Sequence, residues 1–237
     1  MKPREREGWR PQLTPQEKRL GWVFFGLYLL VFPVVMAWIW RILDQVLDIY
    51  FSAEAVSSAV YYVIVLLILV AAFWEFLRHA LRLFAQRVPE NLFAILTGLG
   101  GFLVVTSLVG LIPLPVQNPV LFDYRQQFLL APGSTLAVVV LLRPAVEEIL
   151  YRGLLFGSLR GVSRPLAYVV STLLFALGSV WQYAVPGGGP AYLLLAIQYL
   201  PLGVALAWSY DNGGSVYAPI ILRVIAQALV LAVIVHS

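Results

Sequence analysis

Long apolar runs separated by short polar segments make up most of the chain. A polar stretch covers residues 1–19. Seven apolar segments follow it, at residues 20–40, 55–77, 92–112, 134–159, 165–183, 192–210 and 215–235. An α-helix needs about 20 mainly apolar residues to cross the hydrocarbon core of a bilayer. The pattern therefore predicts an all-α, polytopic transmembrane helical bundle of about seven spans, and an eighth, half-inserted helix fits near residues 120–130.

Local signals refine this pattern. Thr14, Pro15 and Glu17 predict a capped helix start just before the first span. Residues 78–87 combine arginines with leucine and phenylalanine, which predicts a short amphipathic helix at the membrane surface. Residues 211–214 predict a tight turn between the last two spans. Three glycines of the third span predict close contact with a neighbouring helix: Gly98, Gly100 and Gly101.

The composition supports a membrane protein. Of the 237 residues, 61% are hydrophobic and 12% are charged, whereas a soluble domain carries about a quarter charged residues. Cysteine is absent, so disulfides, thiol nucleophiles and thiolate metal sites are excluded. No basic stripe is interleaved with stacking aromatic residues, so nucleic acid is not an expected partner. Membrane lipid is.

The placement of the cations predicts how the chain is oriented. With the N-terminus in the cytoplasm, the inner segments hold eleven lysines and arginines and the outer segments hold two. Such a bias places the cation-rich segments in the cytoplasm. We therefore expect a cytoplasmic tail at residues 1–19, N-terminal membrane helices at 20–133, a core of membrane helices at 134–237 and an external C-terminus. The expected location is a bacterial plasma membrane.

The fourth span carries charges that the other spans largely lack. Arg143 lies four residues before Glu147, and Arg152 lies four residues after Glu148, so each carboxylate has a guanidinium one helical turn away. Charges at membrane depth are costly and usually face the protein interior, where they mark functional sites. The alternative interpretation is a salt-bridge cluster that only fixes helix packing.

A pair of buried carboxylates can act as a general base toward water, bind a metal ion or relay protons. A metal site would need further ligands, usually imidazoles. His79 and His236 are the only histidines. Both belong to segments remote from Glu147, and we interpret them as interfacial residues rather than ligands.

Three sequence motifs in order resemble one family. Glu147-Glu148-Ile-Leu-Tyr-Arg152 is similar to the EExxxR signature of the CAAX-protease and bacteriocin-processing family of intramembrane endopeptidases. Residues 171–179, STLLFALGS, resemble the FxxxH helix of that family, with Phe175 in the phenylalanine position. Residues 214–227, GSVYAPIILRVIAQ, resemble its GSxWxPxxxHxxxN helix. The resemblance covers residues 134–235 approximately.

The resemblance implies a set of roles. In the family, the first glutamate activates water, while the histidines and the asparagine support it and the oxyanion or bind metal. Glu147 then matches the base, and Glu148 and Arg152 match its partners. Three catalytic positions carry altered residue types: Ser179 and Arg223 replace the two histidines and Gln227 replaces the asparagine. Zinc is expected for an intact member of the family, but its ligands are missing here, so we expect no cofactor.

We expect Arg223 to pair with Glu147 or Glu148 and to make that carboxylate a weaker base. Three functions remain open. The favoured one is a pseudoprotease that binds a lipidated or other membrane-tethered peptide. The second is an active glutamate-dependent intramembrane protease with unusual supporting residues. The third is a small transporter that uses the buried Glu/Arg cluster. The site is predicted between the fourth, fifth and seventh spans, approached from the cytoplasmic side.

Overall fold

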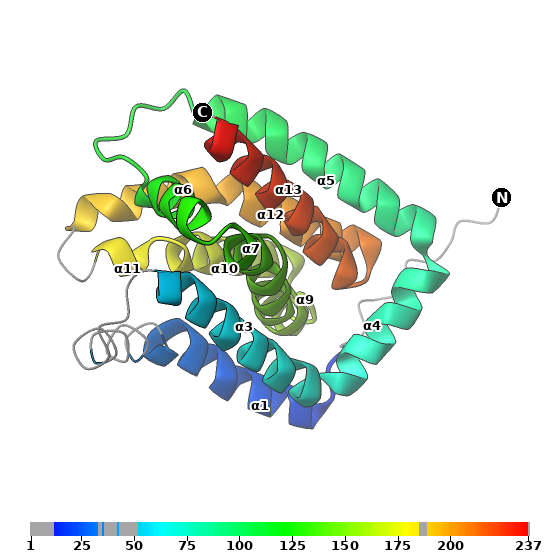
Figure 1. Cartoon of the computed structure of the whole chain (residues 1–237). Coiled ribbons are helices and arrows are strands. Elements are labelled where there is room, and N and C mark those ends of the chain that lie inside the picture. Colours follow the sequence, from blue (N-terminus) through cyan, green and yellow to red (C-terminus); the bar gives the residue numbers. More distant parts are fainter. Residues whose placement is uncertain (1–11, 33–34, 36–41, 43–51, 185–188, 237) are drawn as a thin grey trace.

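The computed structural model describes residues 12–32, 35, 42, 52–184 and 189–236, and every regular element in these ranges is a helix (Figure 1). This confirms the all-α fold class. The first half of the described chain contains α1 (Pro15–Gly26), η1 (Leu27–Val31), α3 (Ser52–Ala72), α4 (Trp74–Gln86), α5 (Val88–Val109) and α6 (Pro119–Leu130). The second half contains α7 (Pro132–Leu136), η2 (Ala137–Leu142), α8 (Arg143–Glu148), η3 (Ile149–Phe156), α9 (Gly157–Arg160), α10 (Arg164–Gly178), α11 (Trp181–Tyr183), η5 (Pro190–Leu195), α12 (Ala196–Gly213) and α13 (Tyr217–His236).

Four helical stretches are long and apolar enough to cross a membrane: Val88–Val109, Arg164–Tyr183, Pro190–Gly213 and Tyr217–Val235. They correspond to the predicted third, fifth, sixth and seventh spans. The bent pair α3–α4 would add a fifth. Length and apolarity therefore yield fewer spans than the seven predicted, and part of the predicted first span lies outside the described residues.

The predicted fourth span is a single run of helix from Pro132 to Arg160, formed by α7, η2, α8, η3 and α9. Its glutamates and arginines reduce its apolarity. In Figure 1 this run lies near the middle of the bundle, seen almost end-on, and it contacts α1, α3, α10, α12 and α13. The predicted helix near residues 120–130 is confirmed as α6.

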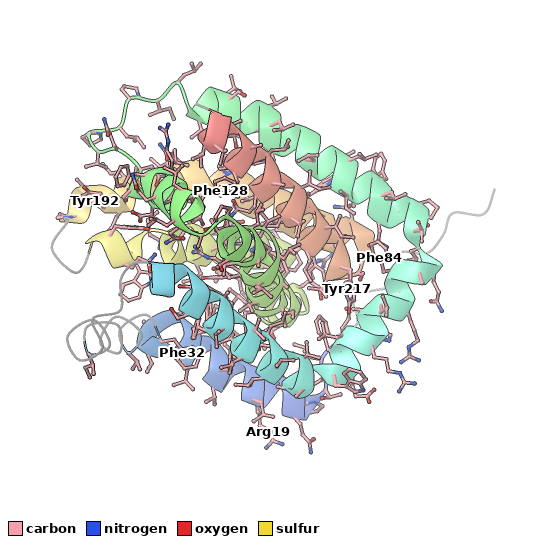
Figure 2. All side chains as sticks on the ribbon, viewed as in Figure 1. Arg19, Phe32, Phe84, Phe128, Tyr192 and Tyr217 are labelled. Atoms are coloured by element: carbon pink, nitrogen blue, oxygen red, sulfur yellow. The ribbon has the colours of Figure 1, made fainter. Side chains whose placement is uncertain are left out.

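The second span is shorter than predicted. Helix α3 ends at Ala72 rather than near Leu77, and the chain turns by 85° into α4. Helix α4 buries Phe76, Leu77 and Ala80 and exposes its arginines. If α3 continued straight, the arginines would extend along the axis of the apolar span. The bend instead lets α4 keep one apolar and one polar face. In Figure 2, Phe84 of α4 lies beside Tyr217 of α13, with ring centroids 6.3 Å apart.

Glu17 joins the first turns of two helices. Thr14 and Glu17 form the predicted capping box, in which the Thr14 hydroxyl accepts from the Glu17 N–H and the Glu17 carboxylate accepts from the Thr14 N–H. The other carboxylate oxygen, Oε1, accepts from the backbone N–H of Phe76 at 2.9 Å, in the first turn of α4. A carboxylate is favourable at a helix N-terminus, so this one stabilises the starts of both α1 and α4.

The predicted turn at residues 211–214 starts later than expected. Helix α12 continues through Gly213, and the chain leaves it at Gly214, which has φ = 81°. A glycine in this left-handed conformation is the common way to end a helix. The polar residues Asp211 and Asn212 therefore belong to the last turn of α12 and not to a loop.

Only one of the three glycines of α5 makes the predicted close contact. A Cβ atom on Gly98 would come within 2.6 Å of Leu222 Cδ1 and 3.2 Å of the Ala205 carbonyl oxygen, whereas Gly100 and Gly101 face open space. The expectation was wrong for the latter two because they lie on the helix face that points away from the bundle. Gly98 thus allows α5 to approach α12 and α13.

We predict that Gly98→Leu lowers the free energy of unfolding by about 1–3 kcal/mol, the usual cost of overpacking. Gly101→Leu is the matched control and is expected to change it by less than about 0.5 kcal/mol. Thermal and denaturant unfolding of the two variants in the same detergent measures the difference. Equal stability of the two would contradict the described packing of α5.

Candidate functional site

Five charged side chains form the centre of the bundle, and we call them the ion-pair cluster: Arg143, Glu147, Glu148, Arg152 and Arg223. Four of these side chains are 0–6% exposed, and Arg143 is 21% exposed. They come from two consecutive segments of the central helical run, α8 and η3, and from α13. An ionised group in such surroundings is stable only when it is paired, and each member of the cluster has a partner.

Arg223 connects the two glutamates. Its Nη1 donates to Glu148 Oε1 at 2.8 Å, and its Nη2 donates to Glu147 Oε2. The planar guanidinium presents its donors in a fixed fork, which suits such a two-point contact. The predicted pairing of Arg223 is confirmed, and it extends to both glutamates rather than one. Through it α13 is tied to α8.

The two pairs predicted along the helix are also confirmed. Arg143 Nε lies 2.7 Å from Glu147 Oε1, and Arg152 Nε lies 3.2 Å from Glu148 Oε2. The segments on both sides of α8, η2 and η3, are π-helical. Short π-helical segments are rare and frequently occur at functional sites. Here they flank the six-residue helix that carries both glutamates.

Several neighbours of the cluster were not found from the sequence. The Tyr28 hydroxyl, from η1, donates to Glu147 Oε1 at 2.9 Å. Arg152 Nη2 donates to the carbonyl oxygen of Gly203 at 2.9 Å. A Cβ atom on Gly203 would lie only 2.9 Å from Thr172 Cγ2 of α10. The glycine therefore allows α12 to approach α10 closely. Tyr28 is one tyrosine in an apolar run, and no local pattern distinguishes it.

Phe175 contacts both of the buried arginines. The guanidinium carbons of Arg152 and Arg223 lie 4.7 and 4.8 Å from the centroid of its ring. Cations at such distances are attracted by the ring quadrupole. The motif match identified Phe175, but its role as a platform for two arginines is visible only in the structure.

Two of the altered catalytic positions do not reach the glutamates. The Ser179 hydroxyl donates to the Phe175 carbonyl oxygen at 2.9 Å, one turn back along α10. Gln227 is half-buried one turn beyond Arg223 and makes no hydrogen bond to the described residues. Of the three positions where the family has its histidines and asparagine, Arg223 alone acts on Glu147 and Glu148.

The residues around the glutamates do not fit a zinc ion. The nitrogen groups in hydrogen-bond contact with the carboxylates are the guanidiniums of Arg143, Arg152 and Arg223, which carry protons and offer no lone pair. His79 is exposed on α4, and the side chain of His236 lies outside the described set. Within the described part of the chain, no group of three or more His, Cys, Asp or Glu residues is placed to hold a metal.

The cluster limits what Glu147 can do chemically. One of its oxygens accepts from Tyr28 and Arg143, and the other accepts from Arg223. A carboxylate with two guanidinium partners is stabilised in its ionised form, which makes it a poor proton acceptor. The arrangement therefore favours a fixed, charged contact between helices over the activation of a water molecule.

The family comparison agrees with the motifs. Residues 129–229 match the model of the family described as "Type II CAAX prenyl endopeptidase Rce1-like". The segment that holds the cluster thus matches the CAAX-protease and bacteriocin-processing family, and together with the apolar helices this match indicates an integral membrane protein. No curated protein and no solved structure matches the chain significantly.

We predict that Arg223→Gln lowers the free energy of unfolding by about 3–5 kcal/mol, because it removes a direct ion-pair partner from both buried carboxylates. The control Arg164→Gln breaks a pair with Asp211 in which the arginine is 47% exposed, and it is expected to cost about 1 kcal/mol or less. Unfolding in detergent measures both.

The double variant Arg223→Gln with Glu148→Gln also removes one of the carboxylates that lost its partner and returns the cluster to its original net charge, so it is expected to recover part of the lost stability. This variant also keeps the test informative if the single variant does not fold. A single variant that is as stable as the wild type would show that the Arg223 contacts contribute nothing.

Proposed function

We propose that this protein is a non-hydrolytic member of the CAAX-protease and bacteriocin-processing family that binds a membrane-tethered or lipidated peptide. The observation that carries the proposal is the double contact of Arg223 with Glu147 and Glu148. At a position where the family has an imidazole, this chain places a group that neutralises the base.

General-base catalysis requires a carboxylate that can accept a proton from water within hydrogen-bond reach. Glu147 already accepts from three donors and is paired with two arginines. Loss of one oxyanion donor typically lowers a hydrolytic rate by a factor of about 10²–10³, and here Ser179 and Gln227 are altered as well. The expected cleavage rate is therefore very low.

The binding part of the proposal rests on what this chain has kept. The EExxxR motif, Phe175 and the helices of the family segment are retained. A cluster that served packing alone would not need the family arrangement of residues, and buried ion pairs are often no more stabilising than apolar packing. We place the N-terminus in the cytoplasm and the C-terminus outside a bacterial plasma membrane, with membrane lipid as a further partner.

Two alternatives remain as outcomes of the test. In an active protease, Arg223 would stabilise an oxyanion instead of blocking the base. In a transporter, the cluster would exchange ions or protons. The family match supports the first of these more than the second.

Cleavage of a quenched membrane-peptide library in detergent micelles tests the proposal. We expect no cleavage by the wild type, and no change in Glu147→Ala. We expect cleavage to appear in the double variant Ser179→His with Arg223→His, because an imidazole can support Glu147 without neutralising it.

The matched control is Ser107→His with Arg78→His, which makes the same substitutions at exposed positions of α5 and α4. It should stay inactive. Cleavage by the wild type that is lost in Glu147→Ala would overturn the proposal and identify an active protease. Proton flux in liposomes that depends on Glu147 would instead identify the transporter.

A further inference from the structure

The ion-pair cluster carries more positive than negative charge. Three arginines face two glutamates, so one positive charge is left over. Buried charges are normally balanced by a partner. Asp123 of α6 does not supply the missing negative charge, because it accepts from the Tyr183 hydroxyl at 3.0 Å and forms no ion pair with a described cation.

Arg143 is where the surplus charge can be reached. It is the most exposed member of the cluster, and its guanidinium is only partly used. Nε donates to Glu147, and Nη1 donates to the Tyr124 hydroxyl at 3.2 Å. Its third nitrogen, Nη2, makes no hydrogen bond within the described residues. A guanidinium with one unused edge is suited to bind an anion.

Several tyrosine hydroxyls lie near Arg143. Tyr62, Tyr183 and Tyr199 lie close enough to interact electrostatically with Arg143. Asn118, the N-cap residue of α6, donates to Gln198 and Tyr199 of α12, at 2.9 and 3.2 Å, and fixes their side chains. We call Arg143, Tyr124, Tyr183 and Tyr199 the Arg143 subsite. The Tyr124 hydroxyl accepts from Arg143 Nη1, so its own proton can be donated to an anion that Arg143 pairs with.

We propose that the Arg143 subsite binds a carboxylate of the membrane-tethered peptide, either its C-terminal group or an acidic side chain. This inference rests on the proposed function, because it names the chemistry of the ligand that the protein would hold. A carboxylate matches the planar guanidinium and would neutralise the surplus charge.

The depth of Arg143 favours a peptide over a phospholipid. At 1.5 Å per residue, the helical run from Pro132 to Arg160 is about 42 Å long, and Arg143 lies about 5 Å from its midpoint. With the helix centred in the bilayer, lipid phosphates lie at least about 15 Å from the bilayer centre. A peptide that enters between the helices can bring a carboxylate to Arg143, whereas a headgroup cannot.

Binding of a defined probe tests the inference. The probe is a palmitoylated, fluorescent peptide of neutral residues, made with a free C-terminus, with a C-terminal amide, or as the amide with one central glutamate. Fluorescence anisotropy measures its affinity for the full chain in phosphatidylcholine nanodiscs. We expect at least one carboxylate form to bind about tenfold or more tightly than the neutral amide, since a charged hydrogen-bonded contact has that strength.

Arg143→Gln should remove this preference, while the control Arg78→Gln, at an exposed position of α4, should keep it. Arg143 also supports Glu147, so a second variant is needed. Tyr124→Phe keeps the Arg143–Glu147 pair and should reduce the preference about two- to tenfold, the effect of one hydrogen bond.

The outcomes separate the two proposals. Equal affinity for all three peptides overturns the subsite and leaves peptide binding standing. If no peptide binds, the proposed function is overturned. The subsite is then tested by comparing how much laurate, a carboxylate, and lauramide, its neutral amide, raise the thermal stability of the protein. Stabilisation by laurate that is lost in Arg143→Gln supports it, and equal stabilisation overturns it. If the protein prefers phosphatidylglycerol in a way that depends on Arg143, and shows no preference for peptide carboxylates, the assignment of the subsite to a peptide is overturned.

Discussion

The structure depends on the pairing of charges inside an apolar bundle. A carboxylate or guanidinium without a partner at this depth would cost several kcal/mol, so the helices that carry these groups must meet in one arrangement. Arg223 brings α13 to the glutamates of α8, Arg152 brings η3 to the Gly203 carbonyl of α12, and Tyr28 brings η1 to Glu147. The elements of the core thus meet at one set of contacts.

The contacts of Arg223 give the physical reason for the proposed loss of hydrolysis. An imidazole accepts or donates a proton near neutral pH, whereas a guanidinium stays charged and only donates. With arginine at position 223, the pair of glutamates becomes an acceptor for fixed donors. Ser179, whose hydroxyl turns back to Phe175, adds nothing to that pair. Interactions that rigidify such a site commonly reduce activity.

Parts of the molecule outside the cluster follow simpler rules. Helix α5 exposes most of its apolar side chains, as expected for a helix that faces lipid. Gly98 faces α12 and α13, and the sequence spacing of the three glycines did not reveal which one would. The bend between α3 and α4 was also not predicted, since an apolar run shows where a helix can lie in a membrane but not the direction of the next one.

The sequence by itself determined the helical class, several of the spans, the capped start of α1 and the two ion pairs along the central helix. These features depend on residues no more than a few positions apart, where helical geometry fixes the distance. The family motifs also identified the segment that holds the ion-pair cluster. Only the tertiary structure decided that Arg223 pairs with both glutamates, that Tyr28 joins them, that Phe175 lies against two arginines and that one edge of Arg143 makes no hydrogen bond to the described residues. These contacts join residues separated by up to 119 positions in the chain, so helix packing and not local sequence brings them together.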